Sequence, residues 1–215
     1  NAFGKGGYQM TREQETAAIQ SVLDGDVNAF EVLVKEYEKN VYNLALRMTG
    51  NSEDAADMSQ EAFIKAYNSL SSFRGDSKFS VWLYRIVSNV CLDYLRSRTR
   101  KPTVSLSTEN DDGEEIELDI ADGTQSPEFL FDRRLTRDAV RRGLAALPPD
   151  HREILLLREI QGLSYEEIAA ALELEAGTVK SRIFRARKKL CSFLIKDGNI
   201  PEFISSSKER GGDLS

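Results

Sequence analysis

A stretch of carboxylates without counter-charge divides this chain of 215 residues. Residues 102–131 contain nine Asp and Glu side chains and no Lys or Arg, and residues 103–126 are rich in Ser, Thr, Asp, Glu and Gly. Such a segment buries too little apolar surface to offset the entropy of ordering it, and its charges repel one another. We therefore predict a flexible acidic linker at 102–126 between two parts that each retain enough chain to bury a core.

The formal net charge of −6 hides a basic block on either side of this linker. Residues 74–101 carry seven basic and two acidic side chains, and residues 132–196 carry 14 basic and nine acidic ones. Positive patches attract the phosphate backbone, so this pattern favours contact with a nucleic acid at two separate places.

Apolar residues recur every three or four positions in both parts, and no useful period-2 run appears, so the predicted fold class is all-α. The clearest stripe is Phe30, Leu33, Val34, Tyr37, Val41, Leu44, Ala45 and Met48. Further helices are expected at about 53–70, 81–98, 127–146, 149–160, 164–172 and 177–195. The architecture is thus two helical domains, a bundle followed by a helix-turn-helix domain, joined by the acidic linker.

The segment from Ser164 to Leu190 has a helix-turn-helix layout. Ser164 and Glu167 form a capping box at the start of the first helix, and Glu173 to Gly177 makes the tight turn. In the second helix the core face is expected to be Val179, Ile183, Ala186 and Leu190.

The opposite side of that second helix is polar and basic. It carries Lys180, Ser181, Phe184, Arg185 and Lys188, flanked by Arg182, Arg187 and Lys189. A helix fits the major groove, where Arg binds guanine through two hydrogen bonds and Lys or Ser contacts phosphates. The motif predicts DNA readout. The alternative is a basic helix that only solvates its charges, and the same motif occurs in many two-component-type regulators.

Other classes are disfavoured. No run of about 18 apolar residues could span a bilayer, and residues 1–10 lack a signal-peptide pattern. Cys91 and Cys191 stand alone, which predicts buried reduced thiols and a cytoplasmic protein. The single histidine, His151, is expected to be a surface residue near a DNA backbone. We expect no enzymatic activity, no cofactor, no metal and no small-molecule substrate.

Several motifs resemble extracytoplasmic-function RNA polymerase sigma factors, close to the sigma-E type. In the first part they are Asp54-x-x-Asp57-x-x-Gln60-Glu61-Ala62-Phe63-Ile64-Lys65-Ala66-Tyr67, Phe73-Arg-Gly-Asp76 and Trp82-Leu-Tyr-Arg-Ile86. In the second they are Leu147-Pro-Pro-x-x-Arg152, Gly162-Leu-Ser-Tyr-Glu-Glu-Ile-Ala169 and Gly177-Thr-Val-Lys-Ser-Arg-Ile-Phe-Arg-Ala-Arg187.

The resemblance covers about residues 13–195 and implies a domain division. Residues 13–101 correspond to region 2 and residues 127–196 to region 4. Residues 1–12 are expected to be a disordered start, in which Asn1-Ala2 resembles an expression remnant. Residues 197–215 form a tail to which no role is assigned.

The resemblance also implies site residues and partners. Core RNA polymerase is expected to bind through its β′ coiled coil and β flap, the coiled coil on Asp54, Asp57, Gln60 and Glu61. The −10 element of promoter DNA would contact Lys65, Ser69, Phe73, Arg74, Lys78, Arg85, Ser88 and Asn89. The −35 element would contact Tyr165, Thr178, Lys180, Ser181, Arg182, Phe184, Arg185 and Lys188. An anti-sigma factor is a further implied partner, and no membrane insertion is expected.

Alternatives remain for three features. The alternative for the acidic helix face is an ordinary solvated surface. In the family the linker occupies the RNA path of polymerase; the alternative is that it is only a soluble spacer. The alternative for the whole chain is a promoter-binding regulator whose first half is a sensory domain. That reading predicts tight binding to duplex DNA unaided, whereas a sigma factor should bind promoters poorly without polymerase.

Overall fold

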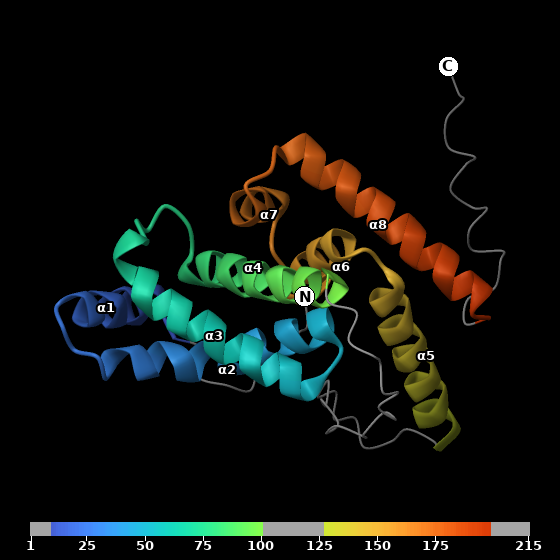
Figure 1. Ribbon diagram of the computed structural model, residues 1–215, viewed down its shortest axis with the longest axis horizontal. Helices are drawn as coiled ribbons and strands as arrows, with labels where there is room; N and C mark the ends of the chain where they lie inside the picture. Colours follow the sequence, from blue (N-terminus) through green and yellow to red (C-terminus); the bar gives the residue numbers. More distant parts are fainter. Residues whose placement is uncertain (1–9, 101–126, 199–215) are drawn as a thin grey trace.

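The structure is a computed structural model that describes residues 10–100 and 127–198 (Figure 1). The described residues are helical and contain no β-strand, so the all-α prediction is confirmed. The predicted linker, residues 102–126, lies outside the described residues. The elements are α1 (Arg12–Leu23), α2 (Ala29–Thr49), α3 (Ser52–Ser69), η1 (Leu70–Ser72), α4 (Phe79–Arg100), α5 (Pro127–Ala146), α6 (Pro149–Leu155), η2 (Leu156–Ile160), α7 (Tyr165–Leu172) and α8 (Ala176–Lys196).

Helices α2, α3 and α4 pack on one another, and α1 lies against α2 (Figure 1). The predicted apolar stripe of α2 is largely buried, and Gly50 ends the helix in the left-handed conformation that suits glycine. Helix α1 was not among the sequence predictions. Its local signal is the capping box of Thr11 and Gln14.

An aromatic cluster closes one end of this bundle. The ring of Phe79 is fully buried and lies 5.5 Å from the rings of both Tyr37 and Trp82, centroid to centroid. Phe73 joins the cluster at 5.6 Å from Phe79 and 5.3 Å from Trp82. Trp82 is half-buried against the core, and these contacts fix the loop that leads into α4.

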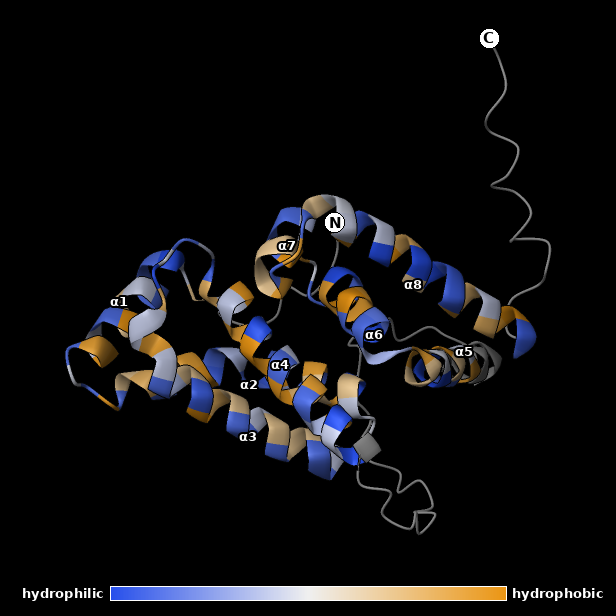
Figure 2. Cartoon of the chain, turned by 45° about the horizontal axis from the view of Figure 1, so that its top comes forward, coloured by the Kyte–Doolittle hydropathy of each residue, from blue (hydrophilic) through white to orange (hydrophobic). Residues whose placement is uncertain are grey.

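In the second half, α8 packs across α5, α6 and α7. Figure 2 shows hydrophobic and hydrophilic residues alternating in stripes along α8, as an amphipathic helix requires. A Cβ at Gly143 of α5 would lie 2.7 Å from Cδ1 of Leu190, so glycine allows α5 and α8 to approach closely. The predicted helix 149–160 changes at Leu156 from α-helix to the π-helical turn η2.

The two halves share one continuous apolar core. Helix α4 contacts α6 and α7, and α2 contacts α5 and α6 (Figure 1). Both cysteines are free; Cys91 is buried, which raises its pKa to about 12, and Cys191 is half-buried. Among residues 10–100 and 127–198, no helix combines the length and the apolar character needed to cross a membrane.

Candidate nucleic-acid interface

The helix-turn-helix forms as the sequence predicted. The backbone N–H of Glu167 donates to Oγ of Ser164 at 3.1 Å, and the N–H of Ser164 donates to Oε2 of Glu167 at 2.8 Å. Helix α7 ends at Glu173, whose φ of 53° is left-handed. Gly177 lies inside the first turn of α8 rather than in the preceding turn, because α8 begins at Ala176.

Helix α8 separates its core face from an outer face. Val179, Ile183 and Ala186 are buried, whereas Phe184 is 68% exposed. The other predicted −35 residues of this helix are exposed, apart from half-buried Ser181 and Arg182: Thr178, Lys180, Arg185 and Lys188. The outer face is therefore available to a duplex.

Hydrogen bonds show which arginines of α8 point to solvent and which are bound to other parts of the second half. Arg185 donates from Nη2 to Oγ of Ser181 at 3.4 Å, which holds it along the outer face. Arg187 instead donates from Nε to Oε1 of Glu159 at 3.0 Å, so its charge is used within the domain. Tyr165 is half-buried, with the guanidinium of Arg158 5.0 Å from its ring centroid.

A cavity of about 370 Å³ opens between α3 and α4. It brings together three predicted −10 residues, Lys65, Ser69 and Asn89. The remaining lining residues are Asn68, Ile86 and Val90. Sequence reasoning missed Asn68, although its place beside Ser69 and three residues after Lys65 on a helix was a usable signal.

The predicted stacking residue is placed differently. Phe73 does not line this cavity; its ring packs against Phe79 and Trp82 in the aromatic cluster. Arg74 follows it as an exposed residue of the loop before α4. The lining surface of the cavity is mainly apolar, and its residues also carry amide, hydroxyl and ammonium groups.

Three further predicted −10 residues face the other half of the chain. Lys78 Nζ lies 2.8 Å from Oε1 of Glu167, and Arg85 Nη1 lies 2.7 Å from Oε1 of Glu173. Ser88 is fully buried. With the two halves packed together, Ser88 thus cannot reach a nucleic acid.

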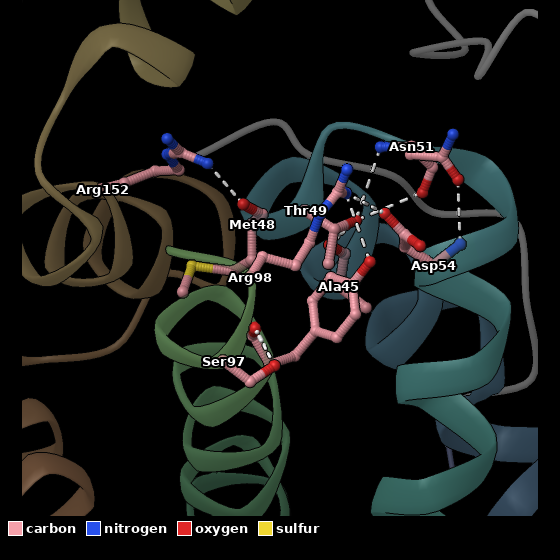
Figure 3. A network of polar contacts seen from close by, with 9 residues as sticks. Ala45, Met48, Thr49, Asn51, Asp54, Ser97, Arg98 and Arg152 are labelled. Carbon is pink, nitrogen blue, oxygen red and sulfur yellow. Dashed lines mark hydrogen bonds and ion pairs between the residues drawn. The ribbon is translucent and has the colours of Figure 1, made fainter. Parts of the chain in front are cut away.

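The acidic face of α3, formed by Asp54, Asp57, Gln60 and Glu61, is partly occupied by contacts within the chain. Oδ2 of Asp54 lies 3.0 Å from Nη1 of Arg98, as Figure 3 shows, and Asp54 is half-buried. Asp57, Gln60 and Glu61 are exposed. Nζ of Lys65, in the cavity, lies 2.7 Å from Oε1 of Glu61. The exposed acidic surface thus adjoins the cavity.

Three polar residues of α6 are buried, and sequence reasoning missed their importance. His151 was expected at the surface; it is buried, its Nδ1 has no partner among the described residues, and burial lowers its pKa. Arg152 donates from Nη1 to the carbonyl of Met48 in α2 (Figure 3). Glu153 lies 3% exposed in the same turn. The available signal was their position directly before the apolar run Ile154–Leu157.

Two family models match the two halves separately. The model for Sigma-70 region 2 matches residues 33–101, and the model for Sigma-70, region 4 matches residues 137–190. Each half of the charge pattern therefore corresponds to one matched region.

Known proteins match most of the chain. The RNA polymerase sigma-H factor of Pseudomonas aeruginosa is 42% identical over 185 residues, which cover 84% of this chain and 94% of that protein. The ECF RNA polymerase sigma-E factor of Escherichia coli K12 is 43% identical over 176 residues, covering 80% and 90%. The structure of CnrH in complex with the cytosolic domain of CnrY superposes with a TM-score of 0.61 at 26% identity, covering 86% of this chain and 99% of that one.

Proposed function

Because this chain belongs to the RNA polymerase sigma factors of the extracytoplasmic-function group, we propose that its two halves read the two elements of a promoter. The protein is a transcription initiation factor that directs RNA polymerase to promoters. Residues 13–101 act as region 2 and residues 127–196 as region 4. The chain contributes no catalytic group of its own and works in the bacterial cytoplasm with core polymerase.

The observation that carries this proposal is the cavity between α3 and α4. It is an open depression of about 370 Å³, lined by Lys65, Asn68, Ser69 and Asn89 among others. We assign it to a base of the −10 element that leaves the stack during melting. Extruding a base costs a few kcal/mol, which edge hydrogen bonds and apolar contact must offset.

The side chains around the cavity suit those two tasks. Asn68 and Asn89 each carry amide donors and an acceptor for a base edge, and Lys65 can approach a phosphate. Ser69 Oγ donates to the carbonyl of Lys65 at 2.6 Å, so its oxygen remains free to accept a hydrogen bond. The base would pack on Ile86 and Val90 rather than stack on Phe73, because Phe73 is held in the aromatic cluster.

The outer face of α8 is proposed to read the −35 element. Arg185 is the best candidate for a bidentate contact with guanine, and Lys180 and Lys188 for phosphate contacts. Phe184 offers apolar area for a thymine methyl group. Tyr165, Thr178, Ser181 and Arg182 border the same face and complete the proposed set.

Protein partners follow from the family and from exposure. Asp57, Gln60 and Glu61 form the exposed part of the surface proposed for the β′ coiled coil of core polymerase, and Asp54 positions the start of α3 beside it. The β flap is proposed to bind region 4. An anti-sigma factor is proposed to bind the same chain, and the complex of CnrH with the cytosolic domain of CnrY supports such a protein partner.

Run-off transcription with purified core polymerase on a genomic promoter pool tests this proposal. The wild-type chain should select a set of promoters with two shared elements, and Asn89→Ala should alter the preferred −10 base while leaving holoenzyme assembly intact. Assembly is measured by co-purification with core polymerase, and base preference by sequencing the transcribed templates.

Asn28→Ala is the matched control, because Asn28 is exposed and makes no side-chain capping bond at the start of α2. It should leave the selected set unchanged. The assignment of the cavity is wrong if Asn89→Ala abolishes assembly. The alternative regulator function would be favoured if the free protein binds one specific duplex tightly and adds nothing to core polymerase.

A further inference from the structure

The contact between the two halves is unusually polar at one place. Helix α4 and the residue before it present two cations and a hydroxyl to α6, α7 and the turn that follows α7. The groups that meet there are Lys78, Arg85 and Ser88 from the first half, and Glu153, Glu167 and Glu173 from the second.

Two of these contacts are ion pairs at the surface. Lys78 pairs with Glu167 at 2.8 Å and Arg85 pairs with Glu173 at 2.7 Å. Exposed pairs of this kind add little stability because water and salt screen them. Their importance is positional, since two carboxylates occupy two cations that the family resemblance assigns to the −10 element of promoter DNA.

The third contact is buried. Oγ of Ser88 and Oε1 of Glu153 are both enclosed, and neither has a hydrogen-bond partner among the residues that the structure describes. Burial raises the pKa of Glu153 to about 7, and the nearby charge of Arg182 opposes this by less. The titratable and charged groups facing it are Cys91 and Arg96 of α4, Arg182 of α8 and Asp150 of its own helix.

We propose that the face of α4 formed by Lys78, Arg85 and Ser88 is a shared docking surface, which α6 and α7 of this chain and the backbone of promoter DNA occupy in turn, and that ionisation of Glu153 releases the two helices. That promoter DNA is the competing ligand rests on the proposed function. The packing of α6 and α7 on α4 is observed in the structure and does not depend on that function.

The direction of the pH effect follows from linkage. Parting the halves exposes Glu153, whose pKa then returns toward its ordinary value of 4.5. Closure, the packing of α6 and α7 on α4, is therefore most favoured below pH 4.5 and weakens as the pH rises through 7. Between pH 6 and pH 8 the closing equilibrium constant should fall about tenfold. Glu167, whose pKa is lowered chiefly by its hydrogen bond with Lys78, stays ionised throughout this range.

Distances between two spin labels measure closure directly. Ser71→Cys and Lys196→Cys place labels on exposed residues of the two halves, in a Cys191→Ser background, and the buried thiol of Cys91 stays unlabelled. The full-length chain should give a single short distance at pH 6 and a growing broad population at pH 8. Glu153→Gln, a neutral isostere, should keep the closed population constant across that range.

Binding to a mixed-sequence single-stranded oligonucleotide of about 20 nucleotides tests competition for the surface. Glu167→Gln with Glu173→Gln frees Lys78 and Arg85, and Gln at 167 still serves the capping box. Affinity at low salt should rise, and the salt slope should steepen by about 1.4, the value for two additional phosphate contacts. The matched control is Glu166→Gln with Glu175→Gln, which removes the same charge from exposed residues without an ion pair in the described chain.

The two arms separate the two claims. Equal DNA binding by the two double variants would overturn the shared surface, and a wild-type label distance that ignores pH would overturn release by ionisation of Glu153. Promoter-selective run-off transcription by wild-type holoenzyme would still stand in that case. Conversely, a closure that responds to pH and to Glu153→Gln, together with failure of all transcription, would overturn the proposed function but not the docking of α6 and α7.

Discussion

At the scale of single residues, Arg152 does the most to connect separate parts of the chain. Its guanidinium donates to the carbonyls of Leu144, Ala145 and Leu147, at 2.8, 2.6 and 3.4 Å, and to that of Met48. The carbonyls of α5 belong to its last turn and to the residue just after it, where helical N–H donors run out, although the carbonyl of Leu144 also accepts from the N–H of Leu147. One buried cation therefore terminates α5 and joins it to the end of α2.

Replacing Arg152 should destabilise the protein strongly. Arg152→Met removes the side-chain donor from the buried carbonyls of Met48 and Leu147 and should lower the free energy of unfolding by about 2–4 kcal/mol, at about 1–3 kcal/mol for each buried acceptor left unpaired. Arg152→Lys should recover only part of this loss, because an ammonium cannot reproduce the planar fork of donors. Urea denaturation gives both values. Exposed Arg137 of α5 provides the control, and an equal effect of Arg137→Met would contradict this role of Arg152.

Whether the individual site residues contact DNA stays a prediction, but residues on one helix face were expected together and lie together. Lys65 and Ser69 on α3 were assigned from sequence, and both line the cavity with Asn89. His151 was expected at the surface, Glu153 was missed, and Phe73 lies in the aromatic cluster and not in the cavity. Their burial depends on neighbours distant in the chain, and no local periodicity carries that information.

At the scale of elements, α8 is the helix whose buried and exposed faces follow most directly from its sequence. The spacing of Val179, Ile183 and Ala186 fixes the buried face, and the basic residues fall opposite. Helix α1 was missed because its apolar stripe is weak, and the π-helical η2 because a widened turn has no sequence period of its own.

The outer face of α8 allows a test that separates base from phosphate contacts. In holoenzyme, Arg185→Ala should cost about 1–3 kcal/mol in promoter binding, chiefly at one base pair of the −35 element. Lys188→Ala should instead weaken binding to all sequences alike and reduce the salt slope by about one. Competition binding with −35 variants at several salt concentrations measures both. A loss for Arg185→Ala that is uniform across the variants would reassign Arg185 to the backbone.

At the scale of the whole molecule, the closed arrangement combines an apolar core with exposed ion pairs. Salt screens the pairs Lys78–Glu167 and Arg85–Glu173 but not apolar burial, because the Debye length falls from about 10 Å at 0.1 M to 3 Å at 1 M. The division of the chain into two helical parts could be predicted from the sequence. The packing of the parts on each other could not, since the apolar residues that join them look the same in the sequence as those that fill the core of either half.

Raising NaCl from 0.05 to 0.5 M at pH 6 should therefore reduce the closed population modestly, as measured with the Ser71 and Lys196 labels. Each exposed pair contributes on the order of 0.2–1 kcal/mol, so the change should stay within about tenfold. Glu167→Gln with Glu173→Gln should remove this salt response, while Glu166→Gln with Glu175→Gln should keep it. Closure that strengthens with salt would mean that apolar contact alone holds the halves together.

The outer face of α8 remains uncovered in the closed chain, with Phe184 68% exposed, whereas Ser88 of α4 is fully buried. The two ends of a promoter would thus be met at different times. The upstream end would meet a surface that is already open, whereas the downstream end would meet the face of α4 only after α6 and α7 have left it.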